Sequence, residues 1–236
     1  MAKIINELSV FFPAYNEEGN IERVVLDAKK VLEETAETWE IIIVDDGSKD
    51  RTGEIADKLA EKHDGIRVIH NKPNKGYGGA LKTGFEAAKY GWVAFTDADG
   101  QFDFSEIKKF IDKQKETNAD LVLGIRTNRA DSLVRKLFTL VWSKILPRIL
   151  LGLRVTDYSC GFKLIRKKVY GDVQPLVGEE KVTQIEMLTK AQRKGFRFAE
   201  VGVSHYPRQS GHATGDDLNV IMKSVFNLFK LMVQLR

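Results

Sequence analysis

The sequence predicts an α/β fold in which a mostly parallel central sheet is flanked by helices. Short runs of β-branched and aromatic residues recur from residue 8 to about residue 125 of the 236-residue chain. Amphipathic segments with the apolar spacing of a helix separate these runs. This alternation is typical of βαβ units, whose helical crossovers make the strands parallel. In open sheets of this type, ligands bind beyond the carboxyl ends of the strands.

The elements can be placed in chain order. Strands are predicted at 8–12, 40–44, 66–70, 92–96 and 121–124, and helices at 21–32, 51–62, 79–90 and 105–116. The second half of the chain is less regular. It predicts a helix over 183–195 that stops at Gly195, a strand over 197–203 and a final amphipathic helix over 216–236.

Length and composition indicate one soluble globular domain, because 43% of the residues are hydrophobic and 30% are charged. No apolar stretch reaches the roughly 18 residues of a membrane span, and the first strand begins too early to leave room for a signal peptide. We therefore expect a cytoplasmic protein. The net charge of +4 suits an anionic partner such as a nucleotide, a lipid phosphate or a membrane surface. We expect no nucleic-acid partner.

Two carboxylates follow the predicted strand 92–96. Asp97 and Asp99 are two residues apart and Gln101 comes two residues later, so on an extended backbone their oxygens can converge on one hard cation. The competing interpretation is a simple turn, because Asp and Gly commonly end strands. The position at the carboxyl end of a strand in a βαβ series favours the metal site.

Acidic residues also follow the first two predicted strands. Asp45 and Asp46 end the apolar run 40–44, and a turn alone does not need two adjacent acids. One of these carboxylates could accept hydrogen bonds from a nucleobase edge or from ribose hydroxyls. After the first strand, Tyr15 and Glu17 are expected to face the same crevice, and Asn16 is a candidate cap for the next helix.

Taken in order, these motifs resemble those of glycosyltransferase family 2, which has the GT-A fold. They are P-x-Y-N-E at 13–17, D-D-G-S at 45–48, N-K-G-x-G-x-A at 74–80 and D-A-D at 97–99. The segments 124–126, 156–169, 184–188 and 207–211, together with Arg135 and Thr139, are similar to dolichol-phosphate mannose synthases and related polyprenyl-phosphate glycosyltransferases. The resemblance covers nearly the whole chain.

The resemblance implies a role for individual residues. The donor-binding set would be Pro13, Tyr15, Glu17, Val44, Asp45, Asp46, Asp97, Ala98 and Asp99. Asp97, Asp99 and Gln101 would hold Mg²⁺ or Mn²⁺. The acceptor phosphate would contact Arg126, Arg135, Thr139 and Arg208, and the catalytic residues would be Asp99, Arg126 and Arg208. Two positions depart from the family pattern: Lys163 replaces an arginine, and Thr214 replaces a lysine.

The expected reaction is an inverting transfer of a hexose from a nucleotide-sugar to a polyprenyl or dolichyl monophosphate. Mannose from GDP-mannose is favoured, and glucose from UDP-glucose is the other candidate. For this reaction, we expect residues 8–125 to form the nucleotide-sugar half of the domain, residues 126–215 the acceptor half and residues 216–236 the final helix. The apolar and basic segment 133–153 suits a membrane interface, which predicts a peripheral protein at the cytosolic face.

Two other functions stay open. A transferase that acts on a sugar or protein hydroxyl would need a general base, for which Glu186 and Asp157 are the candidates. A phosphate acceptor needs none, because its second pKa lies near the roughly 6 of a phosphate monoester. A noncatalytic nucleotide-binding regulator with the same fold is the other alternative, and the intact Asp97, Asp99 and Gln101 argue against it.

Overall fold

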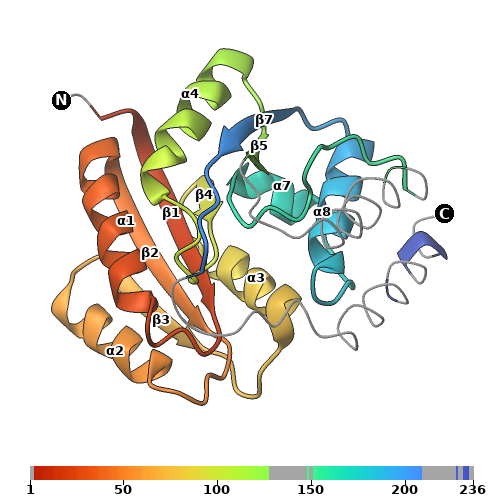
Figure 1. Cartoon of the computed structure of the whole chain (residues 1–236). Helices are drawn as coiled ribbons and strands as arrows, with labels where there is room; N and C mark the ends of the chain where they lie inside the picture. The colour runs from red at the N-terminus through yellow and green to blue at the C-terminus, as the bar shows by residue number, and fades with distance from the viewer. Residues whose placement is uncertain (1–2, 128–147, 149–150, 209–226, 228–230, 234–236) are drawn as a thin grey trace.

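A computed structural model describes residues 3–127, 148, 151–208, 227 and 231–233. Its centre is a seven-stranded sheet in the order β3-β2-β1-β4-β6-β5-β7 (Figure 1). The strands are β1 (Ile5–Ala14), β2 (Ala36–Asp45), β3 (Ile66–His70), β4 (Trp92–Phe95), β5 (Leu121–Arg126), β6 (Lys163–Arg166) and β7 (Phe198–Val203). Neighbouring strands pair in parallel, except that β6 runs antiparallel to both β4 and β5. The predicted mostly parallel α/β sheet is confirmed.

Helices cover both faces of this sheet. They are α1 (Ile21–Thr35), α2 (Thr52–Lys62), α3 (Gly76–Ala87), the short 3₁₀ helix η1 (Phe104–Glu106), α4 (Ile107–Thr117), α7 (Lys167–Asp172) and α8 (Val182–Arg193). Apolar side chains of α1, α2 and α4 share one core cluster with one face of the sheet. Those of α3, α7 and α8 share a second cluster with the other face (Figure 1).

The core explains why the early strands were predictable. Residues 41–44 in β2 are all fully buried, because helices lie on both faces of the strand. The predicted strand 66–70 coincides with β3, and the helix expected over 183–195 is α8. Gly195 follows α8 with a φ of +79°, a left-handed conformation that suits glycine at a helix end.

Several sequence predictions need correction or lie outside the described residues. β6 and α7 were not predicted. Asn16 does not cap α1, because this helix begins at Ile21, directly after Asn20. The side chain of Asn16 instead accepts a hydrogen bond from the backbone N–H of Lys49 at 2.8 Å. The segments 133–153 and 216–236 lie mostly outside the described residues. Arg135, Thr139 and Thr214 lie entirely outside them. Within the described part, the structure has no helix long and apolar enough to span a bilayer.

The topology brings distant segments to one edge of the sheet. The carboxyl ends of β1, β2, β4, β5 and β7 point the same way because these strands are parallel to one another. The antiparallel β6 begins at that edge, with Lys163 paired to Phe95 and Leu123. The loops that follow β1, β2, β4 and β7 and the loop that precedes β6 therefore converge, and they carry the residues described next.

Candidate active site

Asp97 and Asp99 lie together in the loop after β4. Gly100 has a φ of +72° there, which allows the chain to turn sharply. Burial and then the neighbouring charge of Asp99 raise the pKa of Asp97 from its ordinary 3.8 to about 6. Two carboxylates that repel each other in this way form a site whose charge a cation would relieve. The structure thus brings the predicted pair together.

Two neighbours fix the Asp97 carboxylate. The hydroxyl of Tyr77, on α3, donates a hydrogen bond to Asp97 Oδ1 at 2.9 Å. On the other side, a Cβ added at Gly161 would lie 2.2 Å from Asp97 Oδ2. Only a residue without a side chain fits at position 161, so the loop before β6 also shapes the site.

Asp99 faces an arginine that arrives from the far end of the chain. Arg208 Nη2 lies 3.3 Å from Asp99 Oδ2 and 2.8 Å from Glu17 Oε1. Burial raises the pKa of Glu17, although Asn20 and Arg208 counteract it. Three predicted site residues therefore meet across 191 residues of sequence. In this arrangement the guanidinium is an internal cation that neutralises the acidic loops.

Gln101 joins the loop after β4 to the segment that follows β7. Its side-chain Nε2 donates to the carbonyl oxygen of Tyr206 at 2.8 Å, and the Tyr206 N–H donates to the carbonyl oxygen of Gln101 at 2.9 Å. This pairing leaves the side-chain oxygen of Gln101 as its remaining ligand atom. The segment that carries Arg208 is thereby held against the acidic loop.

These residues fit a hard divalent cation that also binds a substrate. Within the described residues, no group of three or more His, Cys, Asp or Glu side chains could enclose a metal ion. Mg²⁺ and Mn²⁺ do not need such an enclosure, because they are commonly held by one or two carboxylates together with substrate phosphates. Asp97, Asp99 and the amide oxygen of Gln101 offer that open set of oxygen ligands.

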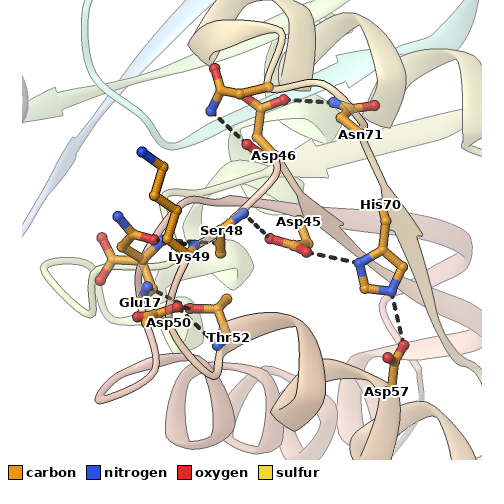
Figure 2. Close-up of polar contacts among 12 residues, drawn as sticks. Glu17, Asp45, Asp46, Ser48, Lys49, Asp50, Thr52, Asp57, His70 and Asn71 are labelled. Atoms are coloured by element: carbon orange, nitrogen blue, oxygen red, sulfur yellow. Dashed lines mark hydrogen bonds and ion pairs between the residues drawn. The ribbon is translucent and has the colours of Figure 1, made fainter.

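Asp45 is the last residue of β2 and Asp46 follows it, but the two acids make different contacts (Figure 2). Asp45 accepts hydrogen bonds from the Ser48 N–H at 3.0 Å and from His70 Nδ1 at 2.8 Å. Burial opposes ionisation of Asp45, but the contacts with Ser48 and His70 hold its pKa below the ordinary value. The other ring nitrogen of His70 lies 3.0 Å from Asp57 Oδ1. Asp45 therefore joins β2, β3 and α2, which gives it a structural role.

Asp46 is the better placed of the two acids to bind a ligand. Its Oδ1 accepts hydrogen bonds from Asn71 Nδ2 at 2.8 Å and from the Lys75 N–H at 3.0 Å. Both contacts fix the carboxylate through the same oxygen, so the other oxygen can accept from a ligand. Figure 2 shows Asp46 with Asn71, away from the pair formed by Asp45 and His70.

The other predicted donor residues surround this edge at different depths. The loop after β1 is tied to the start of α2, because the Glu17 N–H donates to Thr52 Oγ1 at 2.8 Å (Figure 2). Tyr15 is half-buried on that loop, and Pro13 is buried. The side chains of Val44 and Ala98 pack in the two core clusters instead of facing the edge. The expected place of Val44 beside the donor stays a prediction.

Arg126, at the end of β5, is paired with one of the candidate bases. Its Nε and Nη2 donate to the two carboxylate oxygens of Asp157, each at 2.8 Å, and Nη2 also donates to Ser159 Oγ at 2.6 Å. Such a two-pronged contact fixes the plane of the guanidinium. Among the described residues, these contacts use three of its five N–H groups and leave the two on Nη1 for a ligand.

Glu186, the second candidate base, holds a turn. Its Oε2 accepts hydrogen bonds from the backbone N–H groups of Val177 and Gly178 at 2.9 and 2.6 Å. Its Oε1 is 2.6 Å from Lys190 Nζ, and the side chain is almost completely buried. Both carboxylates that the hydroxyl-acceptor alternative requires are thus committed to other contacts.

Sequence reasoning missed Tyr77, Gly161 and Gln184. Tyr77, Gly161 and Gln184 lie within the quoted motifs, but no role was assigned to them. The Tyr77 contact with Gln184 spans 107 residues, and no spacing in the sequence signals such a pair. The one usable signal was a glycine beside a predicted site, because a close approach of the backbone often requires glycine.

Comparisons with known proteins identify the family of this chain. The family model "Glycosyl transferase family 2" matches residues 9–174, more than half of the chain. The glycosyltransferase AglD of Haloferax volcanii is 34% identical over 86% of this chain and 33% of its own length. The dolichyl-phosphate beta-glucosyltransferase of Dictyostelium discoideum is 33% identical over 84% of this chain and 65% of its own length. The chain therefore spans between one third and two thirds of these relatives.

A solved structure shows the same fold. It is glucosyl-3-phosphoglycerate synthase from Mycobacterium tuberculosis, in complex with Mn²⁺, uridine diphosphate and glucosyl-3-phosphoglycerate. The TM-score is 0.73 at 21% identity, with 97% of this chain and 80% of that chain covered. This likeness confirms the GT-A architecture of the sheet and its flanking helices.

Proposed function

The chain belongs to glycosyl transferase family 2, and on this premise we propose that it transfers glucose from UDP-glucose to a polyprenyl or dolichyl phosphate. The Dictyostelium relative is a dolichyl-phosphate beta-glucosyltransferase, which favours glucose over the mannose that the sequence motifs favoured. Residues 8–125 are the donor half in this proposal, and residues 126–215 are the acceptor half.

The choice of a phosphate acceptor rests on one observation. Asp157 and Glu186, the two candidate general bases, are both bound to cationic side chains, at 2.8 Å from Arg126 and 2.6 Å from Lys190. A hydroxyl acceptor would need one of them free to remove a proton. A phosphate monoester is already anionic near neutral pH, since its second pKa is about 6. This site therefore supports a phosphate acceptor better than a hydroxyl acceptor.

On the donor side, Asp97, Asp99 and Gln101 would hold Mg²⁺ or Mn²⁺. When bound, the metal would stabilise the negative charge that develops on the leaving nucleoside diphosphate. Asp46 presents its free carboxylate oxygen at the end of β2, where a base or ribose would lie. Glu17 and Tyr15, on the loop after β1, would line the donor site at the same edge of the sheet.

On the acceptor side, arginines would position one polyanion beside another. Arg126 is held rigidly by Asp157 and retains the two N–H groups of Nη1 for a phosphate. Arg208 would exchange its contacts with Glu17 and Asp99 for contacts with phosphate once a metal neutralises the acids. Arg135 and Thr139 complete the proposed acceptor set from outside the described residues. The transfer would be a single inverting displacement without a covalent intermediate.

A lipid acceptor also requires the enzyme to reach a bilayer. The sequence of 133–153 combines apolar and basic residues, and the chain carries a net charge of +4. Both features suit binding to the anionic cytosolic face of a membrane. Sedimentation with anionic and with neutral vesicles tests this part: equal recovery of the protein with both would argue against electrostatic attachment.

The central experiment measures sugar transfer with Mn²⁺ from UDP-glucose and from GDP-mannose, each offered to a polyprenyl phosphate and to the corresponding polyprenol. We expect turnover with UDP-glucose and the phosphate. Asp99→Ala should abolish it and leave the melting temperature nearly unchanged, because the lost contact with Arg208 is offset by the removal of a charge that repels Asp97. Asp112→Ala, an exposed carboxylate on α4, is the matched control. Full activity of Asp99→Ala would refute the proposed site, and transfer to the polyprenol would refute the acceptor class.

A further inference from the structure

Three polar side chains form a continuous hydrogen-bonded chain behind Asp97. Tyr77 Oη donates to Asp97 Oδ1 at 2.9 Å, and Gln184 Nε2 donates to Tyr77 Oη at 3.1 Å. Lys163 Nζ donates to Gln184 Oε1. Lys163, at the start of β6, is completely buried, and Gln184, on α8, is 1% exposed. The chain thus connects β6, α8 and α3 to the loop after β4.

The direction of every hydrogen bond in this chain follows from Lys163. An ammonium group has only donors, so the amide oxygen of Gln184 must face it. The amide nitrogen then faces Tyr77, and the hydroxyl oxygen of Tyr77 must accept. The hydroxyl hydrogen is consequently directed at the carboxylate of Asp97. The buried positive charge of Lys163, two side chains away, therefore makes the hydroxyl of Tyr77 a hydrogen-bond donor to Asp97.

Lys163 itself is held in place. Its ammonium also donates to the carbonyl oxygen of Cys160 and lies 5.4 Å from the centre of the Phe95 ring. Phe95 is the last residue of β4, so the lysine packs against the strand that leads into Asp97. These contacts fix the ammonium group at one end of the hydrogen-bonded chain. We call this chain, which runs from Lys163 through Gln184 and Tyr77 to Asp97, the relay.

We propose that Lys163, Gln184 and Tyr77 are positioning residues that orient the Asp97 carboxylate to bind the divalent cation. The relay fixes Oδ1 through the hydroxyl of Tyr77, while Oδ2 lies against the backbone of Gly161, where a side chain would clash with it. Groups that orient a metal ligand from outside the coordination sphere commonly change metal affinity by about 10- to 100-fold. This inference rests on the proposed metal-dependent function.

The test measures the affinity for Mn²⁺ alone, by the electron paramagnetic resonance signal of the free ion, without donor or acceptor. Tyr77→Phe removes only the hydroxyl, and we expect its Kd to rise by about 10- to 100-fold. Tyr170→Phe is the matched control. Tyr170 belongs to the core cluster against which Tyr77 packs. Its hydroxyl donates to Glu86 Oε1 at 3.2 Å and makes no contact with Asp97. Its Kd should stay within about twofold of the wild-type value.

A second variant tests the directional argument. In Gln184→Glu the new carboxylate accepts from Lys163 and competes with Asp97 for the single hydroxyl hydrogen of Tyr77. We expect the Kd to rise as in Tyr77→Phe. The double variant should be no weaker than Tyr77→Phe alone, because both changes remove the same hydrogen bond. Melting temperatures of the metal-free proteins report whether any variant is unfolded.

The outcomes separate the relay from the proposed function. A wild-type protein that binds no Mn²⁺, either alone or with UDP, contradicts the proposed function and the relay with it. If the wild-type protein binds Mn²⁺ and Tyr77→Phe binds it equally well, the relay alone is overturned. Additive losses in the double variant would also overturn it, since independent effects would mean that Gln184 does not act through Tyr77.

Discussion

At the scale of single residues, Arg208 occupies the place where a cation is expected. Its guanidinium contacts Asp99 at 3.3 Å and Glu17 at 2.8 Å, so it competes with a metal ion for the charge of the acidic loops. We predict that Arg208→Gln binds Mn²⁺ several-fold more tightly than the wild-type protein when no nucleotide is present. The same variant should lose most of its turnover, because phosphate then lacks its arginine.

The comparison needs an arginine that is close to the loop but outside the acidic pair. Arg23, exposed on α1, is suitable because its Nη2 lies 2.3 Å from the Cβ position of Gly100. Arg23→Gln should change neither the affinity for Mn²⁺ nor the turnover beyond about twofold, since screening weakens an exposed charge. Weaker binding of Mn²⁺ to Arg208→Gln would show that the arginine supports the metal and does not compete with it.

Asp97 and Asp99 were predictable because local sequence places them, whereas their partners were not. A carboxylate pair directly after a buried strand must lie at the sheet edge, whatever the rest of the chain does. The contact of Glu17 with Arg208 depends on the path of β7, and the role of Asp157 depends on which arginine reaches it. Asp157 was therefore interpreted as a candidate base, although its carboxylate binds Arg126 and fixes the guanidinium in place.

At the scale of elements, β6 escaped prediction for a physical reason. It is four residues long and begins with Lys163, a charged side chain that is normally exposed. The lysine is tolerated in the core because the side-chain oxygen of Gln184 and the carbonyl oxygen of Cys160 accept hydrogen bonds from its ammonium group, and both partners lie outside the strand. Strands such as β2, whose residues are apolar almost throughout, carry their own signal in the sequence.

The loop that leads into β6 gives a testable consequence. Gly161→Ala places a methyl group 2.2 Å from the unaltered position of Asp97 Oδ2, so the carboxylate must move. We predict a loss of Mn²⁺-dependent turnover that is larger than the loss of thermal stability. Gly171→Ala on α7 is the control, because nothing lies within 4 Å of its Cβ position. It should be stabilised by about 0.5–1 kcal/mol, as expected for alanine in a helix, and wild-type turnover in Gly161→Ala would contradict the close approach.

The tie between β2, β3 and α2 predicts a pH dependence of stability. The hydrogen bond with Asp45 is the main cause that raises the pKa of His70 above 6.5. Because the folded state then binds the proton more tightly, the stabilisation is complete below pH 6.5 and is lost as the pH rises through the raised pKa. We predict that the free energy of unfolding, measured with urea, falls between about pH 6 and about pH 8.

Two variants isolate the contribution of this histidine. His70→Gln should show a smaller decrease over that pH range, because its side chain does not titrate. His63→Gln, at the end of α2, should retain the wild-type decrease. A decrease of the same size in His70→Gln would assign the pH dependence to other groups.

At the scale of the whole molecule, the candidate site joins segments from both ends of the chain. Glu17 follows β1, Asp46 follows β2, Asp99 follows β4 and Arg208 follows β7. A ligand that contacts several of these loops binds the folded state and not the unfolded chain, so it must raise the free energy of unfolding. The same argument makes donor specificity measurable without knowledge of the acceptor.

We predict that UDP with Mn²⁺ raises the melting temperature more than GDP with Mn²⁺. At 100 times its Kd a ligand adds about 2.7 kcal/mol, which corresponds to about 5 to 11 °C for a chain of this size. Asp99→Ala should lose the part of the shift that depends on Mn²⁺, whereas Asp112→Ala should retain it. An equal or larger shift with GDP would overturn the choice of UDP-glucose as donor. A Mn²⁺-dependent part of the UDP shift that persists in Asp99→Ala would place the metal away from the loop after β4.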